Sequence, residues 1–269
     1  MFSIIRFFAR LMKKRVFVTT SWDDGYILDK RVVKLLDKFK LKGTFYIPKT
    51  NIINLLEDGS KSLLREIGLN TGSLTEKDII KIGENHEIGA HTLTHPKLST
   101  LSAEDAKKEI VDSKKYLEDI LGYKIKMFCY PYGDYNVNVK EIVRNTGFLG
   151  ARTVEMGTTD FPEDPFEFGT TIQVYPRPMT IKLHKTYALP QKFIFSWESQ
   201  VKRFFRRVLK RGGIFHIWGH SWEIEIFDMW DRLENIFEYI SNRKNVIYLS
   251  NGECLENLKI KNFFMHRHA

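Results

Sequence analysis

The chain has 269 residues, of which 43% are hydrophobic and 28% charged, and its formal net charge is +9. This length is enough for one large hydrophobic core, and the composition excludes a disordered or fibrous protein. The two cysteines, Cys129 and Cys254, supply neither a disulfide framework nor a Cys-x-x-Cys metal motif, so a reducing compartment is permitted.

Most of the positive charge is confined to two short segments. Residues 1–15 contain five basic side chains, residues 201–211 contain six, and neither segment contains an acid. Because these eleven charges exceed the net charge of +9, the rest of the chain is slightly acidic. A broad basic surface is therefore not indicated, and we expect no nucleic-acid partner.

The first basic segment has the pattern of an amphipathic helix. Its basic residues fall on one helical face and its apolar residues mainly on the other. Such a helix suits an anionic membrane surface, and a terminal helix packed on the domain is the alternative. The segment is too short and too charged to span a bilayer, and no small-residue cleavage site follows it.

No internal repeat, low-complexity tract or Pro/Gly-rich linker interrupts the rest of the sequence. We therefore predict a basic amphipathic segment at residues 1–14 and one catalytic domain at residues 15–269. With membrane contact through residues 1–15 and no cleavable signal peptide, the protein is expected in the cytoplasm, peripheral to the inner membrane surface.

Strand and helix patterns alternate along the domain. Strand character marks Arg15–Thr20, Gly43–Pro48, Glu87–His91, Lys126–Tyr130, Phe148–Thr153, Thr170–Tyr175, Gly213–Trp218 and Asn245–Leu249. Helical periodicity marks Asp29–Lys40, Leu74–Glu84, Ser102–Leu121, Asn138–Asn145, Ser196–Arg211 and Ile224–Ile240. This alternation predicts a parallel sheet in a barrel-like or doubly wound α/β fold. Both folds place their sites at the carboxyl ends of the strands.

Two adjacent carboxylates follow the first strand. Asp23 and Asp24 precede Gly25, which favours a turn. Neighbouring carboxylates raise the pKa of one of the pair unless a cation is shared. A metal bound by one carboxylate and a proton accepted by the other would relieve this repulsion, and a solvated Asp-Asp-Gly turn is the alternative.

Two histidines follow the third strand. His91 and His95 are four residues apart, a spacing that brings two imidazoles to one divalent ion. Two histidines and one carboxylate form a ligand set that leaves positions open for water and substrate. Further along, a Pro-Gly turn around Tyr132 follows the fourth strand, and His220 follows the strand Gly213–Trp218.

Three segments, taken in this order, resemble the first three motifs of the polysaccharide deacetylases, the NodB-homology group or carbohydrate esterase family four. They are Thr20–Gly25, His91–Pro96 and Tyr130–Gly133. The resemblance implies a distorted, incomplete (β/α) barrel with about seven parallel strands. It also implies a divalent metal, usually zinc, and the removal of an acetyl group, usually N-acetyl, from a sugar of a polysaccharide, glycan or glycolipid.

The resemblance assigns a role to each motif position. It implies that Asp23 is the general base and that the metal ligands are Asp24, His91 and His95. The acetylated glycan or glycolipid is then the expected partner.

The remaining roles lie on later strands. The resemblance implies that Tyr132 offers its backbone N–H to the oxyanion. It also implies a histidine as general acid, which by position is His220, with His216 of the same strand as the alternative.

Two positions depart from the family pattern. Cys129 stands where the third motif usually has an arginine that pairs with the catalytic aspartate, and the fourth motif is not recognisable. We hypothesise that Arg152, at the end of the fifth strand, supplies the missing cation beside Asp23. Glu155 and Glu223 are further candidates for polar support.

Two alternative functions stay open at this point. A related metal-dependent hydrolase could act on a non-sugar amide or cyclic imide with the same metal ligands. A catalytically weak carbohydrate-binding member could keep the fold after losing the usual arginine.

Overall fold

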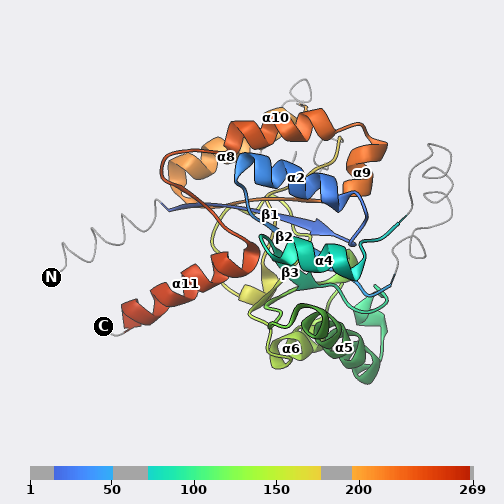
Figure 1. The fold of residues 1–269 in the computed structure, drawn as a ribbon. Helices are drawn as coiled ribbons and strands as arrows, with labels where there is room; N and C mark the ends of the chain where they lie inside the picture. Colours follow the sequence, from blue (N-terminus) through green and yellow to red (C-terminus); the bar gives the residue numbers. More distant parts are fainter. Residues whose placement is uncertain (1–14, 51–71, 177–195, 267–269) are drawn as a thin grey trace.

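The computed structural model describes residues 15–50, 72–176 and 196–266, and the predicted amphipathic segment at residues 1–14 lies outside them. The described part forms one parallel sheet with helices packed around it (Figure 1). The strands are β1 Val16–Asp23, β2 Gly43–Ile47, β3 Glu87–Ala90, β4 Met127–Cys129, β5 Gly150–Arg152, β6 Ile172–Gln173, β7 Gly213–Gly219 and β8 Val246–Tyr248. Among these residues, no helix combines the length and apolarity that a membrane span requires.

The sheet order is β5-β4-β3-β2-β1-β7-β6, with β8 added on β1, and every pairing is parallel. The seven strands of the main path form a half-barrel, which confirms the predicted distorted, incomplete (β/α) barrel. β1 is the centre, because β7 pairs with nearly its whole length. Its other edge is divided between β8, at Val16–Val18, and β2, at Thr20–Asp23.

Helices pack around the half-barrel. They are α2 Asp29–Phe39, α4 Glu76–Gly83, α5 Ala103–Leu121, α6 Val137–Asn145, α8 Trp197–Arg211, α9 Ser221–Ile226, α10 Trp230–Ile240 and α11 Asn251–His266, with 3-10 turns at Leu98–Thr100, Pro131–Gly133 and Pro165–Glu167. In Figure 1, α2, α8 and α10 lie together on one side and α5 and α6 on the other.

Side chains of β1 alternate between the two faces of the sheet. Val16, Val18 and Trp22 pack in the large core between sheet and helices, whereas Phe17 belongs to a smaller core inside the half-barrel. The inward positions that follow Phe17 are polar and buried, and they end in Asp23. β1 therefore changes from an apolar interior at its start to a polar interior at its carboxyl end.

Two predicted elements differ from the structure by more than one or two residues at an end. β1 continues three residues beyond the predicted strand, because pairing with β2 and β7 holds Ser21 to Asp23 extended. The predicted helix Ile224–Ile240 is two helices, α9 and α10, separated where Asp228 adopts a left-handed φ of 48°. A left-handed residue cannot continue a right-handed helix.

The sequence patterns did not predict α11, which closes the amino-terminal end of the half-barrel. Cys254 and Leu255 of α11 pack in the inner core with Phe17, and Cys254 is a buried free thiol. The first residue of α11, Asn251, accepts a hydrogen bond from the Thr19 hydroxyl at 2.7 Å. Its side-chain amide donates to the Tyr46 hydroxyl at 3.0 Å.

We predict that Asn251→Ala lowers the free energy of unfolding by about 2–4 kcal/mol, because it leaves the buried hydroxyl groups of Thr19 and Tyr46 without this partner. Urea denaturation followed by circular dichroism would measure the change. The control is Asn257→Ala on the same helix, whose side chain is only partly buried and donates to the carbonyl oxygen of Glu253 one turn earlier. This variant should change the free energy of unfolding by no more than about 0.5 kcal/mol. Equal losses in the two variants would contradict the prediction.

Candidate active site

The carboxyl ends of β1, β3, β4 and β7 carry a cluster of buried ionisable side chains. Four residues of these ends adopt left-handed φ values although none is glycine: Asp24 (81°), Thr92 (66°), His95 (59°) and Tyr132 (58°). Such conformations are costly and are typical of functional sites. Surrounding hydrogen bonds stabilise them here.

The turn from Thr92 to His95 has two such supports. The His95 N–H donates to the Thr92 hydroxyl at 2.9 Å. Glu109 of α5 accepts the N–H groups of Leu93 and Thr94 at 2.8 and 2.9 Å. Glu109 was not singled out from the sequence, since only the packing of α5 against this turn brings it there.

Three side chains converge in the way expected of metal ligands. Asp24 Oδ1 lies 3.7 Å from His91 Nε2 and 3.5 Å from His95 Nε2, and the two ring nitrogens are 3.1 Å apart. All three side chains are buried, and Asp24 Oδ1 has no hydrogen-bond partner. Three donor atoms that face one another in this way fit a divalent cation.

The protonation states of the two histidines suit the same role. The His91 Nδ1–H donates to the carbonyl oxygen of Cys129 at 2.8 Å, which leaves the Nε2 lone pair directed at Asp24. Burial lowers the pKa of His91 and lowers that of His95 to about 2. Both imidazoles are therefore neutral at pH 7, the form that binds metals.

The second oxygen of Asp24 is held from the opposite side. Asp24 Oδ2 accepts the Trp222 indole N–H at 3.4 Å and lies 3.6 Å from His220 Nε2. The pKa of Asp24 is raised above its ordinary value, mainly by burial and further by the negative charge of Asp23. A cation on Oδ1 would favour the ionised form.

Asp23 is paired with Arg152. The Arg152 guanidinium donates to Asp23 Oδ2, and both side chains are buried. Burial raises the pKa of Asp23, but the Arg152 charge and hydrogen bond outweigh it, so the pKa lies below its ordinary value. The guanidinium lies 4.7 Å from the ring centre of Trp218 and 5.3 Å from that of Tyr46. Arg152 thus lies beside Asp23, at the position that the sequence analysis hypothesised for it.

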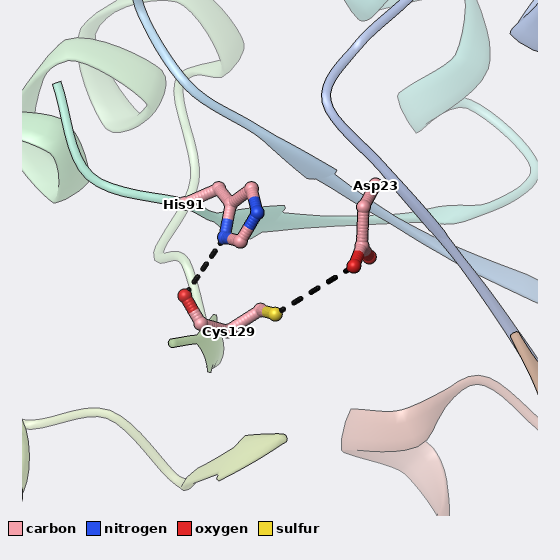
Figure 2. Close-up of side chains that lie close together, drawn as sticks. All are labelled: Asp23, His91 and Cys129. Carbon is pink, nitrogen blue, oxygen red and sulfur yellow. Dashed lines mark hydrogen bonds between the residues drawn. The ribbon is translucent and has the colours of Figure 1, made fainter. Parts of the chain in front are cut away.

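Cys129 lies between His91 and Asp23 (Figure 2). Its carbonyl oxygen accepts from His91, and its thiol lies 4.0 Å from Asp23 Oδ2. Cys129 on β4 is the register partner of Arg152 on β5. The guanidinium therefore reaches Asp23 from the strand next to the one that carries Cys129.

Asp23, His91 and Cys129 form a second group that could hold a metal. Burial raises the pKa of the Cys129 thiol well above its ordinary value, so the thiol stays protonated. Asp23 already has a cation in Arg152. This ion pair favours the group of Asp24, His91 and His95, because the charge of Asp23 is already compensated.

The two candidate acids have different surroundings. His216 bonds the Ser21 hydroxyl at 2.9 Å and the Gly169 carbonyl at 3.2 Å, and burial lowers its pKa to about 3. His220 instead faces Asp24 through Nε2 and bonds Glu223 through Nδ1 at 2.7 Å. Burial lowers the pKa of His220, but the charges of Glu223 and Asp24 prevail and raise it to about 10.

Tyr132, Glu155 and Glu223 are the remaining residues that the sequence analysis named, and they lie in different places. The Tyr132 ring is 55% exposed and lies edge-on to His95, with ring centres 4.6 Å apart. Glu155 is exposed and its backbone pairs with Thr170, so its side chain is not part of the cluster. Of the two glutamates considered for polar support, only Glu223 contacts a site residue.

Comparisons with known proteins agree on one family. A family model described as polysaccharide deacetylase matches residues 11–151. Chitin deacetylase 1 of Cryptococcus neoformans is 28% identical over 151 residues, 52% of this chain and 28% of that protein. The peptidoglycan-N-acetylglucosamine deacetylase of Bacillus cereus is 28% identical over 137 residues, 49% of this chain and 42% of that protein. The chain thus spans less than half the length of these relatives.

The crystal structure of a protein from Mycobacterium smegmatis has the same fold. Its TM-score is 0.59 at 14% sequence identity, with 93% of this chain and 92% of that chain covered. At this identity the likeness concerns the fold alone.

We predict that Arg152→Ala lowers the free energy of unfolding by about 3–5 kcal/mol, because it leaves Asp23 buried without its cation. The control is Arg144→Ala, which removes a half-exposed ion pair with Asp164 and should cost at most about 1 kcal/mol. Urea denaturation would measure both variants. If Arg152→Ala cost no more than Arg144→Ala, the ion pair with Asp23 would not have this importance.

Proposed function

Because the family model matches more than half of the chain, the chain belongs to the polysaccharide deacetylase family, and on this premise we propose that it is a metal-dependent hydrolase that removes N-acetyl groups from a sugar polymer or glycolipid. One observation carries the proposal. The three metal-binding candidates share one buried cluster with a carboxylate paired to arginine and with the imidazole of His220. These are the groups that the hydrolysis of an amide requires.

Asp24, His91 and His95 would hold the metal, and zinc is the ion we propose. The unpartnered Asp24 Oδ1 and the two imidazole nitrogens that face it fit such an ion. When bound, the metal supplies a positive charge that polarises the acetyl carbonyl and makes a water molecule more acidic.

Asp23 is the proposed general base. Its ion pair with Arg152 keeps it ionised, and its Oδ1 is buried without a hydrogen-bond partner. The carboxylate takes a proton from water as the water oxygen attacks the acetyl carbon. The negative oxygen of the tetrahedral intermediate is assigned to the backbone N–H of Tyr132, in the turn that packs on His95.

His220 is the proposed general acid. As the bond between the acetyl carbon and the nitrogen breaks, His220 gives its Nε2 proton to the leaving amine, and the products are acetate and a free amino sugar. An amine leaves poorly as an anion, so this proton is needed. The position of Nε2 next to Asp24 supports His220, and the hydrogen bonds of His216 to Ser21 and Gly169 argue against that residue.

The names of the relatives support an N-acetylglucosamine polymer as the substrate, since they refer to chitin and to peptidoglycan N-acetylglucosamine. The presence of Arg152 beside Asp23 favours an active enzyme over a weak carbohydrate-binding member. Contact of residues 1–15 with an anionic membrane, on the cytoplasmic side, stays a separate proposal that rests on their sequence alone.

We predict that the zinc-loaded protein releases acetate from N-acetylglucosamine oligomers and that a chelator abolishes this activity. Asp24→Ala should lose bound metal and activity together. Asp23→Asn should keep the metal, because Asp23 is not a ligand, and should lower kcat by at least about 100-fold. Acetate assays with metal analysis of the same samples would measure both properties.

The control for these variants is Asp119→Asn, which changes an exposed carboxylate of α5 and should alter neither metal content nor turnover. A panel of small amides and cyclic imides tests the alternative substrate class. Turnover of that panel without acetate release from the oligomers would contradict the proposed substrate. Normal turnover in Asp23→Asn would contradict the assigned base.

A further inference from the structure

The turn from His220 to Glu223, at the start of α9, carries the proposed acid and a buried carboxylate that the mechanism above does not use. Glu223 is 8% exposed, and its Oε2 lies 2.7 Å from His220 Nδ1. We propose that Glu223 is a positioning residue, which holds the Nδ1–H of His220 so that the Nε2–H is directed at the leaving group. This inference rests on the function proposed above.

Glu223 is itself fixed from another element. Gln173 of β6 donates its side-chain amide to Glu223 Oε2 at 2.9 Å. The same carboxylate oxygen therefore accepts from Gln173 and from His220, which defines its position. His220, Glu223 and Gln173 form a chain of hydrogen bonds that runs from the metal-binding cluster to the edge strand of the half-barrel.

Two tryptophans flank the imidazole of His220. The ring centre of Trp218 is 5.5 Å away at an interplanar angle of 70°, and that of Trp222 is 5.4 Å away at 34°. These contacts restrict where the ring lies, but they do not distinguish its two nitrogens. Only a polar partner can select which nitrogen faces Asp24, and Glu223 provides it.

A separate contact anchors the backbone of the turn. The Ser221 hydroxyl donates to Asp29 Oδ1 of α2 at 2.6 Å, and both side chains are fully buried. This bond holds the turn in place without contacting the imidazole ring. Asp29 therefore holds the turn through Ser221, whereas Glu223 contacts the imidazole ring of His220. A variant of Ser221 tests a structural role, and a variant of Glu223 tests a positioning role.

The reaction step that depends on His220 gives the discriminating measurement. An acetylated amine must receive a proton as its bond to the acetyl carbon breaks, whereas 4-nitrophenolate leaves as a stable anion without one. Loss of the acid's orientation should thus slow the hydrolysis of amides and leave that of 4-nitrophenyl acetate almost unchanged. A general loss of structure slows both reactions.

The experiment compares Glu223→Ala, Ser221→Ala and the unaltered chain, all zinc-loaded, on an N-acetylglucosamine oligomer and on 4-nitrophenyl acetate, with the chelator-resistant rate subtracted. For Glu223→Ala we expect kcat on the oligomer to fall about 100-fold with KM retained, and the rate on the ester to change less than about threefold. For Ser221→Ala we expect any loss to be equal on the two substrates. The double variant His220→Ala/Glu223→Ala should be no slower than His220→Ala, because the two residues act as a unit.

Equal losses on amide and ester in Glu223→Ala, or unchanged turnover of the amide, would overturn the role of Glu223 while leaving the proposed function intact. If the unaltered chain did not hydrolyse the oligomer, the proposed function would fail and this inference with it. Circular dichroism and metal analysis of each variant show whether it is folded and loaded, so that a loss caused by unfolding counts as the structural outcome.

Discussion

Two carboxylates on consecutive residues lie buried at the carboxyl end of β1, and this is the constraint on which the rest of the site depends. Removing one carboxylate from water is costly unless a cation accompanies it, and two adjacent ones repel each other as well. Asp23 and Asp24 avoid direct competition because Asp23 ends the strand while Asp24 turns away from it in a left-handed conformation. Each carboxylate can then have its own partner.

The two carboxylates have different partners. Arg152 approaches Asp23 from β5, close to the rings of Tyr46 and Trp218, and lowers its pKa. Asp24 faces His91 and His95 on one side and Trp222 and His220 on the other. Asp23 is thereby kept ionised next to a permanent cation, and one oxygen of Asp24 stays without a hydrogen-bond partner. The half-barrel makes this possible because its parallel strands end at one rim.

Local patterns in the sequence predicted much of this arrangement. Asp24, His91 and His95 could be named because each follows a strand in the sequence, and parallel strands bring their carboxyl ends together. The role of Arg152 could be hypothesised for the same reason. The structure adds that Arg152 is the register partner of Cys129 on the neighbouring strand and that its guanidinium pairs with Asp23.

Other features depend on contacts between distant segments, and the sequence alone could not specify them. His216 and His220 are four residues apart on and just after β7, so the alternation of side chains along a strand places them on the same face and does not distinguish them. In the structure they have different partners, Ser21 for His216 and Glu223 for His220. Glu109 supports the histidine turn only through the packing of α5. α11 has little amphipathic pattern, and its place at the end of the half-barrel depends on Asn251 and the inner core.

X-ray absorption spectroscopy of the zinc-loaded protein would test the central claim most directly, because the two possible metal groups differ in one atom type. If Asp24, His91 and His95 hold the ion, we expect nitrogen and oxygen ligands at about 2.0–2.2 Å and no sulfur. A sulfur ligand at about 2.3 Å would place the metal on Cys129, with Asp23 and His91. This result would contradict the proposal that Asp24 binds the metal and Asp23 does not.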